Sequence, residues 1–194
     1  MAAFEAAIAL GCHCIEFDVR LTSDGRAVLS HDDIPRGDDG PRSVSRLRMD
    51  QIADARLVGP DTILELVRGR IGAHVDLQVR GGEVAVVAQI VEALGTEDLI
   101  ITTAEDSSVH EILRWSRLRA PGLLVGLSPS PRAAGPHRWS RWIASVESSF
   151  PRLRIHLSGA DLVVSHRTVA RLSLRSYARR RGLPLLVVTV DDPA

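Results

Sequence analysis

The chain has 194 residues, of which 45% are hydrophobic and 25% charged, a composition typical of a globular protein with one core. Its 24 basic and 24 acidic residues balance, so charge favours neither a nucleic acid nor an anionic membrane as partner. Every basic residue is arginine, so no lysine is available for catalysis or phosphate binding. No apolar run reaches the roughly 18 residues of a membrane span. The N-terminus lacks the basic region of a signal peptide, and we expect a cytoplasmic protein.

The elements predicted first are a helix that ends at Gly11, a strand over "CIEFDVRL", a tight turn at "SDG" and a second extended run that ends at His31. A polar loop over residues 32–46 follows, and then two short helices. From there strands and helices alternate to the last strand. The predicted strands are "AHVDLQV", "LIITTA", "GLLVGLS", "ADLVVSH" and "PLLVVTV", and the helices between them include one at 140–149 and one over "TVARLSLRSYARRRG".

This alternation predicts an α/β protein with a parallel sheet. Six strands of the parallel type are found, whereas a (β/α)8 barrel has eight and about 250 residues. The sequence is therefore interpreted as a single domain over residues 1–194, an incomplete barrel without its first and last strands. The gap is expected between the first and last of the six strands.

Acidic residues mark two of the predicted strands. Glu16 and Asp18 are two apart, so both project from one face of their strand, and Asp76 lies in the middle of a later apolar strand. Neighbouring carboxylates repel unless a cation or a proton separates them, and oxygen-only ligands favour Mg²⁺ or Ca²⁺. His31 ends its extended run, where a barrel presents its site, and a histidine there is suited to proton transfer.

Each of these signals has a structural alternative. An E-x-D pair on a strand occurs by chance, a buried carboxylate can pair with an arginine, and His31-Asp32 is compatible with a simple loop turn. The combination with Asp76 favours a site. The remaining histidines, His74 among them, are expected at the surface or at strand ends.

The segment "AAFEAAIALGCHCIEFDVRLTSDGRAVLSHDD" resembles the N-terminal part of the glycerophosphodiester phosphodiesterase family, with an E-x-D strand, a "TSDG" turn and a His-Asp pair. The weaker blocks "TILELV", "VDLQV" and "LPLLVVTVDDPA" follow in the family's order. The resemblance implies a (β/α)8 barrel that hydrolyses glycerophosphodiesters to glycerol 3-phosphate and an alcohol. It implies that Glu16 and Asp18 bind the metal and that His31 is a catalytic histidine.

The sequence departs from the family pattern in three places. The family's His-Arg-Gly motif, which carries the other acid–base histidine, is absent from this sequence. Asp76 and Gln78 stand where the family has a glutamate ligand and a lysine, so Asp76 is the expected third metal ligand and the neutral Gln78 the expected substrate contact. Val188 replaces a tryptophan.

The leading hypothesis is thus a metal-dependent phosphodiesterase with Mg²⁺ or Ca²⁺ as cofactor and a small phosphodiester as substrate, weakly active or inactive on its own because of truncation. One alternative is a non-catalytic barrel relative that retains a metal or ligand site. Another is a barrel phosphodiesterase that acts on phospholipids. No nucleic-acid partner and no membrane span are expected, and the sequence leaves the oligomeric state open.

Overall fold

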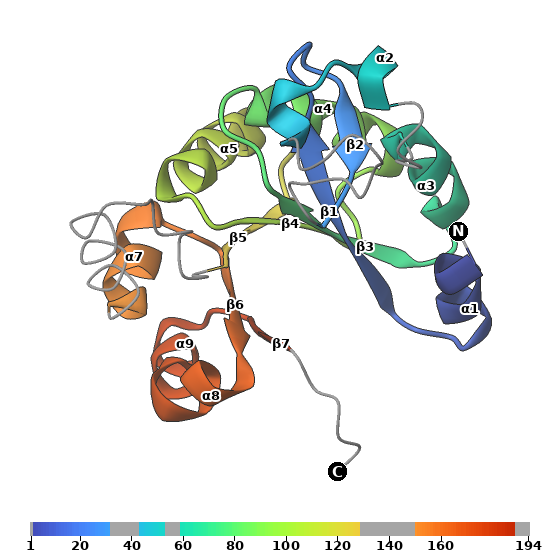
Figure 1. The fold of residues 1–194 in the computed structure, drawn as a ribbon. Coiled ribbons are helices and arrows are strands. Elements are labelled where there is room, and N and C mark those ends of the chain that lie inside the picture. Colours follow the sequence, from blue (N-terminus) through green and yellow to red (C-terminus); the bar gives the residue numbers. More distant parts are fainter. Residues whose placement is uncertain (1, 32–42, 53–58, 129–149, 189–194) are drawn as a thin grey trace. The chain divides into compact units, whose positions relative to one another are not determined.

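The computed structural model describes residues 2–31, 43–52, 59–128 and 150–188. Its strands form one sheet with the hydrogen-bonded order β2-β1-β3-β4-β5-β6-β7 (Figure 1). The strands are β1 (Cys14–Leu21), β2 (Ala27–Leu29), β3 (Gly72–Leu77), β4 (Leu99–Thr103), β5 (Leu124–Leu127), β6 (Leu162–His166) and β7 (Leu185–Val188). The helices are α1 (Ala2–Ala9), η1 (Val44–Arg46), α2 (Met49–Ile52), α3 (Pro60–Val67), α4 (Glu83–Leu94), α5 (Asp106–Arg119), α7 (Pro151–Ser158), α8 (Arg167–Val169), η3 (Ala170–Leu174) and α9 (Arg175–Arg181).

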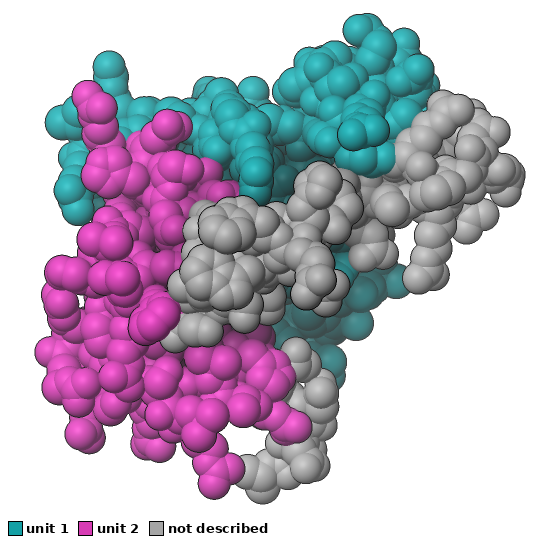
Figure 2. Space-filling view, turned by 60° about the vertical axis from the view of Figure 1, so that its left-hand side comes forward, with its two compact units in different colours: residues 1–101, 115–123 teal, residues 102–114, 124–194 magenta. Residues whose placement is uncertain are grey.

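The chain divides into two compact units, coloured separately in Figure 2. One unit comprises residues 1–101 and 115–123, and the other comprises residues 102–114 and 124–194. All the expected site residues belong to the first unit. The single domain over 1–194 stays a prediction. Among the helices of the described ranges, none combines the length and the apolar character needed to cross a bilayer.

Strand β1 has two chemically different faces. Ile15, Phe17 and Val19 are buried, and the Phe17 ring lies 6.2 Å from the Phe4 ring of α1, centroid to centroid. The side chains between them, Glu16 and Asp18, are exposed and half-buried. Because side chains alternate along a strand, the acidic pair projects from the face opposite the apolar one.

Strand β3 extends the apolar face and the acidic face of β1. It runs parallel to β1 with Glu16 opposite His74 and Asp18 opposite Asp76. Ala73, Val75 and Leu77 are buried, between 0% and 3% exposed. Cross-strand partners project to the same side of a sheet, so Asp76 shares the face of Glu16 and Asp18.

The hairpin between β1 and β2 is fixed by its turn. The Thr22 hydroxyl donates to Asp24 Oδ1 at 2.7 Å and accepts from the Arg26 amide at 2.9 Å. Gly25 has φ 74°, a left-handed conformation that suits glycine. Asp24 Oδ1 also accepts from the Met49 amide at 3.1 Å, which ties the turn to α2.

The second unit follows the parallel pattern. Strand β6 pairs in parallel with β5 and with β7. The guanidinium of the buried Arg154 on α7 donates to Asp106 Oδ2 at 3.1 Å and to the Ala104 carbonyl at 2.7 Å. The helix expected over "TVARLSLRSYARRRG" is confirmed by the contiguous α8, η3 and α9, of which η3 has π-helical geometry.

The sheet begins at β2 and ends at β7, so it does not close into a ring within the described ranges. The expected position of the gap needs one correction. Strand β2 pairs antiparallel with β1 and therefore occupies the edge that was expected to be open beside the first strand. The helix expected at 140–149 lies outside the described residues.

The Gly72→Ala substitution is expected to destabilise the fold. An added Cβ at Gly72 would lie 2.9 Å from the His13 carbonyl oxygen and 3.1 Å from that of Asp98, and backbone on both sides cannot yield easily. We expect a loss of about 1–3 kcal/mol in the free energy of unfolding, measured by urea denaturation. Gly59→Ala is the control, since no heavy atom lies within 4 Å of its added Cβ; equal losses in both variants would contradict the account.

Candidate active site

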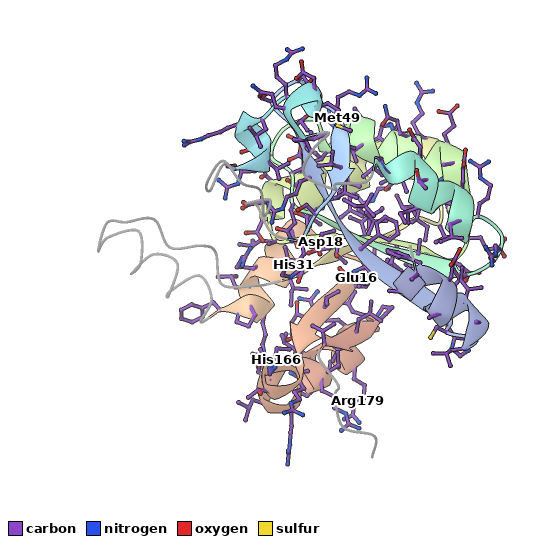
Figure 3. All side chains as sticks on the ribbon, turned by 45° about the vertical axis from the view of Figure 1, so that its right-hand side comes forward. Glu16, Asp18, His31, Met49, His166 and Arg179 are labelled. Carbon is purple, nitrogen blue, oxygen red and sulfur yellow. The ribbon has the colours of Figure 1, made fainter. Side chains whose placement is uncertain are left out.

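Three carboxylates share one face of the β1–β3 pair. Asp18 and Asp76 are direct cross-strand neighbours, and Glu16 precedes Asp18 by two residues on β1. Figure 3 shows Glu16 and Asp18 next to each other, with His31 beside them. The sequence-predicted residues Glu16, Asp18, Asp76 and His31 are therefore brought together in the first unit.

Gln78 lies directly beyond the end of β3 and contacts two of these carboxylates. Its amide nitrogen donates to Asp76 Oδ2 at 2.6 Å and to Asp18 Oδ1 at 3.4 Å. The Gln78 backbone amide donates to the Val19 carbonyl at 2.9 Å, which continues the β1–β3 ladder. The neutral side chain thus supplies the hydrogen-bond donor between two acids that would otherwise face each other.

His31 reaches the carboxylates for a different reason than the one expected from the sequence. Strand β2 runs antiparallel to β1, so its end is not at the carboxyl edge of the parallel strands. The chain instead returns along β1, and the Ser30 amide donates to the Asp18 carbonyl at 3.2 Å. This return places His31 close to Glu16 and Asp18. Its charge lowers their pKa values, but this effect is smaller than the desolvation that raises them. Asp32, its partner in the sequence motif, lies outside the described residues.

Arg20 holds the backbone of this returning segment. Its Nε donates to the Ser30 carbonyl at 3.1 Å, and its Nη2 donates to the His31 carbonyl at 2.9 Å. The sequence interpretation did not single out Arg20. The sequence spacing nevertheless indicates its position: Arg20 is two residues after Asp18 and therefore shares the acidic face.

His74 was placed incorrectly from the sequence. It is 8% exposed and lies within β3 opposite Glu16, not at the surface or at a strand end. Burial lowers the pKa of His74, and the nearby Asp76 acts in the opposite direction. The spacing His74-x-Asp76 was the available signal, since it puts both side chains on the same face.

Glu16 and Asp18 are in an environment that disfavours their charge. Although the Glu16 side chain is exposed at its surface, the surrounding protein removes part of its solvent. This desolvation raises the pKa of Glu16 to about 7, and the charges of Asp18 and Asp76 add to the effect. Burial also raises the pKa of Asp18, followed by the charge of Asp76, against His31, the Gln78 hydrogen bond and Arg20, which lower it. A positive charge bound at this face would relieve both effects.

The donor atoms fit a hard divalent cation in type and in charge. Glu16, Asp18 and Asp76 offer only oxygen, which Mg²⁺ and Ca²⁺ prefer. In the part of the chain that the structure describes, however, no three His, Cys, Asp or Glu side chains are arranged so that they hold a metal ion. The Gln78 amide nitrogen lies between Asp18 and Asp76 instead. The cation stays a prediction, and a cation bound to these two oxygens would have to displace that amide.

The acidic face predicts an unusual pH dependence of stability. Because the pKa of Glu16 rises from 4.5 to about 7 on folding, the folded chain binds more protons than the unfolded chain between these pH values. Stability without a cation should therefore fall as pH rises from about 4.5 to about 7. Melting temperatures in EDTA across this range test the sign, and Glu16→Gln should flatten the dependence. Identical pH profiles for both proteins would contradict the assignment.

The chain is similar to known proteins in sequence and in structure. The model of the glycerophosphoryl diester phosphodiesterase family matches residues 1–116, whereas the search of curated proteins gave no match. Glycerophosphodiester phosphodiesterases from Agrobacterium tumefaciens and Thermotoga maritima are similar in structure. The Agrobacterium tumefaciens protein is 22% identical with a TM-score of 0.66, and the match covers 96% of this chain and 78% of that one. The Thermotoga maritima protein is 20% identical with a TM-score of 0.69, and the match covers 99% of this chain and 79% of that one.

A third solved structure is a phosphodiesterase from Oleispira antarctica in complex with the product sn-glycerol 3-phosphate. It is 18% identical with a TM-score of 0.66, and the match covers 98% of this chain and 78% of that one. At these identities the structural matches show the fold. They confirm the predicted barrel class, of which the described sheet is an incomplete form.

Proposed function

The chain belongs to the glycerophosphoryl diester phosphodiesterase family, and from this premise we propose that it hydrolyses glycerophosphodiesters to glycerol 3-phosphate and an alcohol in a cation-dependent reaction. The observation that carries the proposal is the cross-strand register. It places Asp18 opposite Asp76 and sets Glu16 on the same face, while the β1–β2 hairpin returns His31 to them.

Glu16, Asp18 and Asp76 are the residues proposed to hold Mg²⁺ or Ca²⁺. The raised pKa values of Glu16 and Asp18 support this role, because desolvated carboxylates gain most from a bound positive charge. Asp76 shares their face of the sheet. When bound, the cation would supply Lewis-acid stabilisation of the charge that develops on the phosphoryl oxygens.

His31 is the proposed proton-transfer residue. Its side chain is exposed, so it is accessible to a substrate, and Arg20 fixes its backbone through the carbonyl oxygen. A histidine titrates near neutral pH and both accepts and donates a proton in that range. His31 is therefore suited to move a proton on or off a substrate oxygen.

Gln78 is the proposed substrate contact. Its amide is held by Asp76 and Asp18 in the described arrangement, and it becomes available to a phosphoryl oxygen only after leaving them. As a neutral donor it forms a weaker interaction with phosphate than a charged one would. We therefore expect low activity from this chain.

The same Gln78 contacts favour a second candidate, a non-catalytic relative. An amide nitrogen 2.6 Å from Asp76 Oδ2 would compete with a cation for that oxygen. A protein in which the Gln78 amide always stays bound to Asp18 and Asp76 would keep the fold and lack hydrolytic activity. Activity measurements separate the two candidates directly.

The test is to incubate the purified chain with glycerophosphocholine and with glycerophosphoethanolamine, and to measure glycerol 3-phosphate release. The proposal predicts slow release from at least one substrate. EDTA should stop the release, and Mg²⁺ or Ca²⁺ should restore it. No release with either substrate at any cation concentration would favour the non-catalytic relative, and release unaffected by EDTA would refute the cation-dependent mechanism.

A further inference from the structure

The side chain of Gln78 connects acids from two neighbouring strands. Asp18 belongs to β1 and Asp76 to β3, and the two are direct cross-strand partners. The amide nitrogen of Gln78 donates to an oxygen of each, at 3.4 Å and 2.6 Å. Like charges directly opposite each other destabilise a sheet, and the two N–H groups of a glutamine amide can satisfy one acid each.

The amide and a divalent cation would compete for the same oxygens. The Gln78 amide nitrogen contacts Asp18 Oδ1 and Asp76 Oδ2, and a cation held by Asp18 and Asp76 through these two oxygens would need the same electron pairs. The positive ends of the two N–H dipoles would repel the cation. An ion held through these two oxygens would therefore have to displace the amide.

We propose that Gln78 is an internal latch that holds Asp18 and Asp76 together in the cation-free protein and competes with the divalent cation for them. The latch sets the cation affinity of the site below that of the carboxylates alone, and it stabilises the β1–β3 pair when no cation is bound. This inference rests on the proposed function, because it assumes that Asp18 and Asp76 bind the ion.

The main experiment replaces Gln78 with methionine, which has a similar length and no amide donor. Titration calorimetry of the whole chain with Mg²⁺ and with Ca²⁺ should show about tenfold tighter binding in Gln78→Met, the scale expected when a hydrogen bond to a charged group no longer has to be given up. The melting temperature of the variant in EDTA should be lower than that of the unchanged chain. Its increase on saturation with the cation should be larger.

Gln89→Met is the matched control. Gln89 is an exposed residue of α4, so this substitution makes the same chemical change away from the acids. It should leave cation affinity and melting temperature unchanged. Equal or weaker binding by Gln78→Met, with the unchanged chain binding normally, would overturn the latch and leave the proposed site intact. Absence of binding by both proteins would overturn the proposed cation site as well.

A measurement on the unchanged chain covers the case in which Gln78→Met does not fold. The side-chain amide protons of Gln78 are observable by ¹⁵N-edited NMR. Addition of Mg²⁺ should shift these resonances and speed their exchange with water, with the same midpoint as the calorimetric titration. Cation binding that leaves the Gln78 amide signals unmoved would refute the latch.

Discussion

Asp18→Asn is expected to reduce glycerol 3-phosphate release by at least about 100-fold, because a bound cation supplies several kcal/mol of transition-state stabilisation and each 1.4 kcal/mol is about tenfold in rate. Asparagine keeps the shape of Asp18 and can still accept the Gln78 hydrogen bond. It removes a charge that faces Asp76 across the β1–β3 pair. Cation affinity should therefore fall together with activity.

The stability of Asp18→Asn distinguishes loss of the site from loss of the fold. Removing one of two facing carboxylates relieves their repulsion, so the melting temperature in EDTA should stay equal or rise. Asp50→Asn is the control, since Asp50 is an exposed residue that forms a 3.5 Å surface ion pair with Arg48, an interaction of small energy. A variant that melts lower and loses activity in proportion would indicate a structural role for Asp18 instead.

His31→Asn should lower the rate by about 10²–10⁴-fold, the usual contribution of a general acid–base group. Asparagine preserves a polar side chain but cannot transfer a proton near neutral pH. The backbone contact with Arg20 is made by the His31 carbonyl, so the substitution should leave the hairpin in place. Rates measured across pH should lose the dependence that titration of the imidazole produces.

His110→Asn controls for the removal of a histidine, because His110 is an exposed residue of α5. It should retain the rate and the pH profile of the unchanged chain. If His31→Asn reacts as fast as His110→Asn, proton transfer belongs to another group. If it loses activity only by weakening cation binding, His31 acts on the carboxylates and not on the substrate.

The acidic face could be predicted from the sequence because period-2 alternation is local. "CIEFDVRL" assigns Glu16 and Asp18 to one face of a strand without knowledge of its neighbours. The position of Asp76 beside them depends on the register of two parallel strands whose paired residues are 58 apart in the chain, and the sequence predicted it only through the expected order of the strands. The α/β class followed in the same way from alternating elements.

The remaining features depend on contacts that sequence patterns do not encode. His31 was selected for an incorrect reason, since the antiparallel direction of β2 depends on the Thr22-Asp24 turn. The spacing of His74 and Asp76 assigns both to one face, but the burial of His74 depends on packing and cannot be predicted from the sequence pattern. Gln78 was interpreted through its likeness to a lysine position. Its actual partners, Asp18 and Asp76, become visible only when the two strands lie side by side.

The measurement that tests the central claim most directly is anomalous diffraction from crystals of the chain grown with Mn²⁺ in place of Mg²⁺. The account predicts one strong peak within about 2.0–2.6 Å of carboxylate oxygens of Glu16, Asp18 and Asp76, with the Gln78 amide turned away from it. A peak bound by other residues would contradict the account. So would crystals saturated with Mn²⁺ in which the Gln78 amide still joins Asp18 to Asp76.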